Sequence, residues 1–142
     1  SRKTPSNKTD FTQNFEALKK DLLDLDARMI ALSAKNPTLP LIASHPIYQY
    51  MARRYNMNIK MMMWEPDEDP GGKEWKQLQE IVKDHPAGWM IWEEEPLPGS
   101  VERLEKLNIQ GQVFSPSFAR PQQGDFLSVM QQNIKNIETI FN

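Results

Sequence analysis

The first 36 residues carry apolar side chains at alternating spacings of four and three, which is the pattern of one long amphipathic helix. The row consists of Phe11, Phe15, Leu18, Leu22, Leu25, Met29 and Leu32. It stops before Asn36-Pro37, a pair that ends helices. Because the row spans only three heptads, the lower limit for a coiled coil, we favour a helix that lies along the back of a domain.

From Pro37 onward, short apolar runs alternate with segments of helical periodicity, which is typical of a parallel sheet with crossover helices. The predicted strands are 39–44, 58–65, 88–92 and 112–114. The predicted helices are 46–55, one around 75–82, one around 101–107, and 126–141. We therefore predict an α/β fold with an about four-stranded parallel sheet and flanking helices, preceded by one long helix. The two parts are residues 1–36, the long helix, and residues 37–142, the α/β lobe.

His45 stands at the junction between the first predicted strand and the helix after it. Ser44 suits an N-cap and Pro46 suits the first helical turn. This placement puts the imidazole beyond the carboxyl end of a strand and over a helix N-terminus, where α/β folds hold ligands. A single histidine is more often structural, but this position favours a role in binding. His85 precedes a proline at a helix end, so we interpret it as a capping side chain rather than a ligand.

Polar groups follow each of the other predicted strands. Glu65 follows the second strand, the acidic run 93–95 follows the third, and Ser115 follows the fourth. The carboxyl ends of parallel strands share one edge, so we expect these groups to converge with His45. An imidazole with one or two carboxylates suits zinc or manganese. The alternative interpretation of the acidic run 93–95 is a solvated turn without a ligand. We interpret the methionines 61–63 as core residues rather than copper ligands, because both faces of a buried strand must be apolar.

Composition narrows the classes of function. The 142 residues suffice for one domain, and 17 basic against 19 acidic residues give no electrostatic case for nucleic acid or an anionic membrane. The absence of cysteine excludes disulfides, zinc–thiolate sites and thiol catalysis. No apolar run reaches the roughly 18–20 residues of a membrane span, and no signal peptide is present. Because the chain begins with Ser rather than Met, we expect a processed or trimmed product.

Four segments, in this order, resemble one protein family. A Ser-His pair precedes a helix rich in Tyr and Arg, an acidic loop contains prolines, a strand ends in glutamates, and a closing helix follows; these are 44–57, 65–70, 90–96 and 126–134. Together they are similar to the zinc- and manganese-binding solute-binding proteins of ABC transporters. The resemblance covers nearly the whole chain, which corresponds to the linking helix and the carboxyl-terminal lobe of that family.

The resemblance implies a metal site with His45 and Glu94 as ligands. Ser115 stands where the family usually has a ligand Asp, and a neutral hydroxyl is a poor substitute for that carboxylate. The family's amino-terminal lobe, which supplies two of the usual four ligands, has no counterpart here. We therefore expect a half-site with weak affinity. Either the other lobe was removed, or the protein is divergent and binds metal weakly or not at all.

The expected function is that of the carboxyl-terminal half of an extracytoplasmic, periplasmic solute-binding component that captures zinc or manganese and delivers it to an ABC permease. No reaction is implied. The alternative is a divergent interaction module of the same fold that binds a protein instead of metal. An enzyme ranks third, because no nucleophile or cofactor loop accompanies the histidine and the carboxylates. In the two-lobed family such a helix packs against both lobes. With one lobe missing, we expect part of the row to be left in water, and therefore a homodimer through the long helix or exchange of this helix between two copies.

Overall fold

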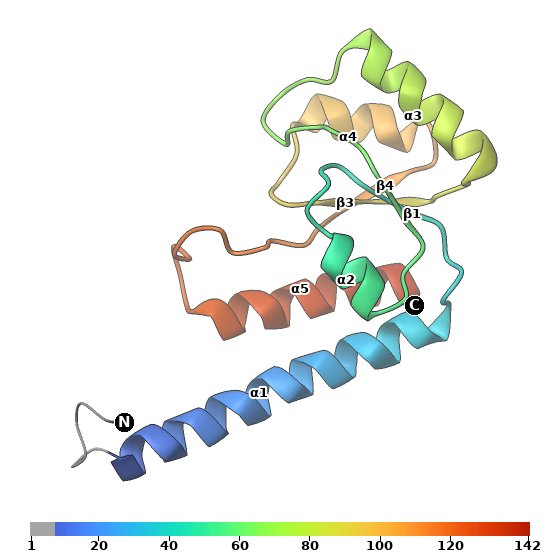
Figure 1. Cartoon of the computed structure of the whole chain (residues 1–142). Helices are drawn as coiled ribbons and strands as arrows, with labels where there is room; N and C mark the ends of the chain where they lie inside the picture. Colours follow the sequence, from blue (N-terminus) through green and yellow to red (C-terminus); the bar gives the residue numbers. More distant parts are fainter. Residues whose placement is uncertain (1–7) are drawn as a thin grey trace.

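The computed structural model describes residues 8–142, which form five helices and one four-stranded sheet (Figure 1). The helices are α1 (Lys8–Lys35), α2 (Gln49–Arg54), α3 (Gly72–Asp84), α4 (Pro98–Glu105) and α5 (Phe126–Phe141). The strands are β1 (Leu41–Ala43), β2 (Ile59–Met61), β3 (Trp89–Trp92) and β4 (Gln110–Val113). All strand pairs are parallel and their order is β2-β1-β3-β4. The predicted fold class is confirmed.

Helices cover both faces of the sheet, with α3 and α4 on one side and α1, α2 and α5 on the other (Figure 1). Neighbouring residues of β1 enter opposite cores: Leu41 and Ala43 face one core and Ile42 faces the other. This double burial explains why the strands read as continuous apolar runs. Of the three methionines predicted to fill the core, Met62 is buried, whereas Met63 is 73% exposed and that part of the prediction is wrong.

The long helix is confirmed, but its own domain covers only its second half. Met29 and Leu32 are buried against the sheet layer, and Arg28 forms an ion pair of 3.1 Å with Glu138 of α5. The apolar residues of the first half remain 40–58% exposed; they are Phe11, Phe15, Leu18 and Leu22. None of the helices in residues 8–142 combines the length and apolar content that crossing a membrane requires.

The predicted start of the second helix is wrong. Ser44 is not a cap and Pro46 is not helical, because α2 begins only after its N-cap residue Tyr48. The Ile47 amide donates to the His45 carbonyl at 2.9 Å, so these residues form a tight turn. The competing force is burial of Tyr48, which is 3% exposed. Burying a large side chain is worth roughly 1.5–3 kcal/mol, more than the roughly 1 kcal/mol of a typical cap.

The prediction that the His85 side chain caps its own helix is wrong. It is buried at the C-cap position of α3, and its Nε2 lies 2.8 Å from the Leu41 carbonyl. Because a carbonyl only accepts, Nε2 carries the proton and donates. The side chain therefore ties the end of α3 to β1 instead of capping its own helix.

The contact between α1 and α2 predicts a pH-dependent stability. The hydrogen bond from Arg54, whose Nε lies 3.0 Å from Asp26, holds the pKa of Asp26 below its usual range, and the Tyr55 hydroxyl adds to this. A lowered pKa contributes stability that is present above the unfolded value of about 3.9 and is lost as pH falls through the folded value. Asp26→Asn should therefore lower the free energy of unfolding at neutral pH, and the difference from wild type should shrink in acid. Urea unfolding across this pH range measures it.

The matched control is Asp24→Asn, an exposed residue on the same helix. It should change stability little and without this pH trend. If the Asp26 variant differed from wild type by the same amount at neutral and acid pH, the charge on Asp26 would not be the cause.

Candidate metal site

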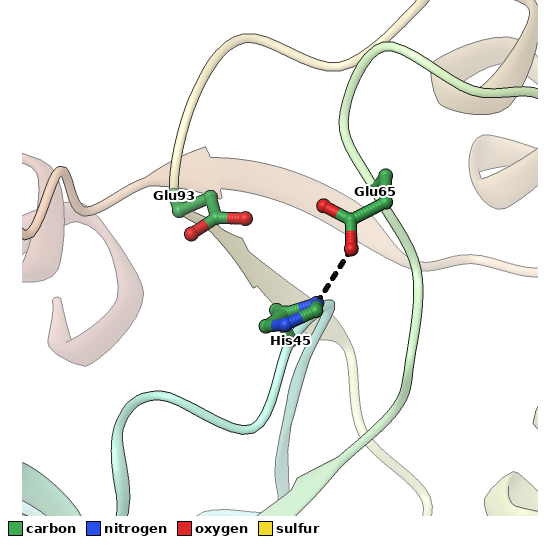
Figure 2. Close-up of side chains that lie close together, drawn as sticks. All are labelled: His45, Glu65 and Glu93. Carbon is green, nitrogen blue, oxygen red and sulfur yellow. Dashed lines mark ion pairs between the residues drawn. The ribbon is translucent and has the colours of Figure 1, made fainter.

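One imidazole and two carboxylates converge at the carboxyl edge of the sheet (Figure 2). His45 follows β1, Glu65 follows β2, and Glu93 comes directly after β3. One ligand atom from each lies within 4.8 Å of the others, and Nδ1 of His45 is 3.3 Å from Oε1 of Glu65. Atoms bound at about 2.0–2.2 Å to one ion lie up to roughly 4 Å apart, so small side-chain movements would bring all three onto a common cation.

The residue before each of these three side chains is buried and held by the extended strand ladder. These residues are Ser44, Trp64 and Trp92. The Ser44 amide donates to the Ile91 carbonyl at 2.9 Å, and the Trp64 amide donates to the Ser44 carbonyl at 2.7 Å. The Trp92 carbonyl accepts the amide of Phe114 at 2.7 Å. The backbone is therefore fixed up to the position where each candidate ligand leaves the sheet.

Three indole rings hold the two glutamate-bearing segments together beneath the site. The ring of Trp64 lies 4.7 Å from Trp75 of α3 and 6.2 Å from Trp92, centroid to centroid. The Arg103 guanidinium of α4 lies over the Trp75 ring at 4.2 Å. Aromatic pairs of this kind add about 0.5–1.5 kcal/mol beyond area burial. These tilted ring contacts therefore pack the chain segment that carries Glu65 against the one that carries Glu93.

The electrostatics of the site are unfavourable without a cation. Glu93 is 9% exposed, and burial, together with the charges of Glu65 and Glu94, raises its pKa, against the opposing effect of His45. Nδ1 of His45 is buried and makes no hydrogen bond to any residue in 8–142, since its contact with Glu65 lacks hydrogen-bond geometry. A divalent cation between these groups would satisfy the ring nitrogen and offset the buried negative charge.

The other two predicted ligands lie at the same edge but outside this cluster. Glu94 is exposed, and it lines a separate cavity of about 320 Å³ together with Ser115. The Ser115 amide donates to Oδ1 of Asn133 at 2.9 Å, and its carbonyl accepts from Nδ2 at 2.7 Å, which ties this backbone to α5. The geometry thus groups His45 with Glu65 and Glu93, and it favours Glu93 over Glu94 as the ligand after β3.

The sequence contained a signal that distinguishes these glutamates. A Trp-Glu pair occurs twice, at 64–65 and at 92–93, and both tryptophans are buried. A buried tryptophan fixes the residue that follows it, whereas Glu94 is one position farther from that anchor. The repeated pair therefore points to Glu65 and Glu93.

Comparisons with known proteins agree with this arrangement of elements. The model of a family described as zinc-uptake complex component A, periplasmic, matches residues 1–140. A search of curated protein sequences found no significant match.

Solved structures of similar fold come from several bacteria. The Zn(II)-bound form of AdcA from Streptococcus pneumoniae has a TM-score of 0.80 at 21% identity, covering 96% of this chain and 31% of that one. The metal-dependent lipoprotein YcdH from Bacillus subtilis has a TM-score of 0.85 at 18% identity, covering 97% and 55%. The periplasmic zinc-binding protein TroA from Treponema pallidum has a TM-score of 0.72 at 18% identity, also covering 97% and 55%. At these identities the likeness shows the fold, and the chain spans about half or less of these relatives.

Burial of the Glu93 carboxylate predicts that this side chain lowers the stability of the metal-free protein at neutral pH. Because the folded state raises the pKa of Glu93, its ionisation costs stability as pH rises from about 4 toward neutral. Glu93→Gln should therefore raise the Tm of the metal-free protein at neutral pH, by about 2–4 °C for each 1 kcal/mol gained. Thermal unfolding in the presence of a chelator measures this.

Glu102→Gln, an exposed change on α4, serves as the control and should leave Tm nearly unchanged. A Glu93→Gln protein less stable than wild type at neutral pH would mean that the carboxylate is well satisfied in the folded state, contrary to the geometry.

Proposed function

Because this chain belongs to the family of the periplasmic zinc-uptake complex component A, we propose that it captures a divalent cation with His45, Glu65 and Glu93. The family consists of solute-binding proteins, not enzymes. The observation that carries the proposal is the buried Nδ1 of His45, which makes no hydrogen bond to any described residue and lies among two carboxylates. Two ionised carboxylates carry a total charge of −2, which balances the +2 charge of a divalent cation.

The ligand set supports zinc or manganese as the cargo. Imidazole nitrogen suits zinc, and carboxylate oxygens suit zinc and the harder manganese ion. Three protein ligands leave the rest of the coordination sphere to water. We therefore expect affinity near the micromolar range, weaker than that of a closed four-ligand site.

The transport role follows from the family. We infer that the bound ion is handed to an ABC permease outside the cytoplasmic membrane, as the description of the matched family supports. The relatives are longer than this chain, which spans 55% of the one from Bacillus subtilis. In this proposal the segment 1–36 corresponds to the helix that links two lobes, and the segment 37–142 corresponds to one of those lobes. The competing function is the divergent interaction module, which would bind a protein and no metal.

Calorimetric titration with zinc, and separately with manganese, tests the metal proposal. The wild-type chain should bind one ion, and His45→Ala should weaken binding by at least about tenfold because the only nitrogen ligand is lost. At an ion concentration of about 100 times Kd, binding should add about 2.7 kcal/mol to the free energy of unfolding.

Two matched variants assign the carboxylate. Glu93→Gln should weaken binding as His45→Ala does, whereas Glu94→Gln should bind nearly as wild type. The reverse result would restore Glu94 as the ligand. Identical isotherms for wild type and His45→Ala would remove His45 from the site, and no heat with either ion would favour the interaction module.

The exposed first half of α1 supports the homodimer. Phe11, Phe15, Leu18 and Leu22 form an apolar row there, and Leu22 also lines a hollow of about 180 Å³ with Phe126 of α5. Each large apolar side chain left in water forgoes roughly 1.5–3 kcal/mol of burial. We propose that a second copy of this chain covers the row through its own α1.

Light scattering tests the association. Wild type should have the mass of two chains, and the double variant Phe11→Ser, Phe15→Ser should have the mass of one. Leu23→Ser is the control, because Leu23 is equally exposed on α1 but lies outside the row. A wild-type monomer whose mass is unchanged in the double variant would contradict the dimer.

A further inference from the structure

Tyr48 connects the turn that carries His45 to the far edge of the sheet. It lies three residues after His45 and is almost completely buried. Its hydroxyl donates to the Phe114 carbonyl at 2.8 Å, and the two rings meet edge to face with centroids 6.0 Å apart. Because β3 lies between β1 and β4, this side chain reaches across the strand end that carries Glu93.

The turn around His45 is held at its two ends. At the start, the Ser44 amide donates to the Ile91 carbonyl of β3. At the end stands Tyr48, after which α2 begins. Within the turn, the backbone bond between Ile47 and His45 is local and does not attach it to the sheet. The position of the imidazole therefore depends on these two anchors.

Phe114, whose carbonyl accepts the Tyr48 hydroxyl, is itself held by backbone hydrogen bonds. The Phe114 amide donates to the Trp92 carbonyl at 2.7 Å, so the same residue is bonded to the residue that precedes Glu93. The carbonyls on either side of the acceptor also have partners, Val113 with Asn136 at 2.8 Å and Ser115 with Asn133 at 2.7 Å. A continuous hydrogen-bonded connection thus runs from the His45 turn through Tyr48 and Phe114 to the strand end bearing Glu93.

We propose that Tyr48 is a positioning residue of the metal site: its hydroxyl holds the His45 imidazole opposite Glu93 before an ion binds. This inference rests on the proposed function. Preorganising a ligand lowers the ordering cost that binding would otherwise include, so loss of the hydroxyl should weaken binding although Tyr48 does not touch the ion. Burial, and then the charge of Glu93, raises the pKa of Tyr48, so the hydroxyl remains a donor at neutral pH.

The variant Tyr48→Phe keeps the ring and removes the hydroxyl. Tyr55→Phe is the matched control, because it removes a comparable hydrogen bond, from Tyr55 to Asp26 at 3.1 Å, that attaches the same helix to α1 instead. Cobalt(II) serves as the probe, since its visible absorption reports coordination geometry, and zinc competition then reports affinity.

Tyr48→Phe should weaken cobalt and zinc binding by at least about tenfold and change the cobalt absorption bands. Tyr55→Phe should leave both unchanged, even where it lowers Tm as much. A purely structural role for Tyr48 would lower Tm without moving the spectrum. Wild-type affinity and spectrum in Tyr48→Phe would overturn the inference, whatever its Tm.

A measurement without metal separates this inference from the metal proposal. The chain has only two histidines, so the ring signals of His45 and His85 can be followed together by NMR. In metal-free Tyr48→Phe the His45 ring signals should shift or broaden, and those of His85 should stay in place. Unchanged His45 signals would overturn the positioning role, whereas failure of wild type to bind any ion would overturn the proposed function.

Discussion

The backbone of Ser44 is bonded on one side to β3 and on the other to the segment that follows β2, and the candidate site depends on this constraint. Its amide donates to the Ile91 carbonyl of β3, and its carbonyl accepts the Trp64 amide beyond β2. These bonds are available because β1 lies between β2 and β3 in the sheet. The next residue is His45, so the imidazole leaves the sheet from a backbone that neither neighbouring strand allows to move.

The same arrangement places a free-energy cost at the site that a bound cation would offset. Glu93 is buried beside other carboxylates, and the buried nitrogen of His45 makes no hydrogen bond within residues 8–142. Burial elsewhere compensates this cost: helices cover both faces of the sheet, and the ring of Trp64 packs against Trp75 near its carboxyl edge. Rigid support beneath polar groups that are poorly satisfied is the arrangement expected of a binding site rather than of a structural salt bridge.

The carboxyl edge of the sheet and the exposed half of α1 are separate features with different physical origins. The edge concentrates charge, because every parallel strand delivers its following residues there. The helix exposes apolar area, because α5 begins opposite the middle of α1 and leaves the first half uncovered (Figure 1). Binding an ion and binding a second chain are therefore independent proposals, and a change in one region is not expected to alter the other.

Local patterns in the sequence were sufficient for the helices, the parallel strands and the placement of His45 at their carboxyl edge, since periodicity and strand ends are encoded over a few residues. Tertiary contacts decided the rest. α2 begins at Gln49 because burial of Tyr48 outweighs the capping signals of Ser44 and Pro46. Glu93, and not Glu94, joins His45, because the side chains of adjacent residues leave a strand end in different directions. Such choices depend on what lies opposite in space, and apart from the repeated Trp-Glu pair the spacing along the chain carries no record of it.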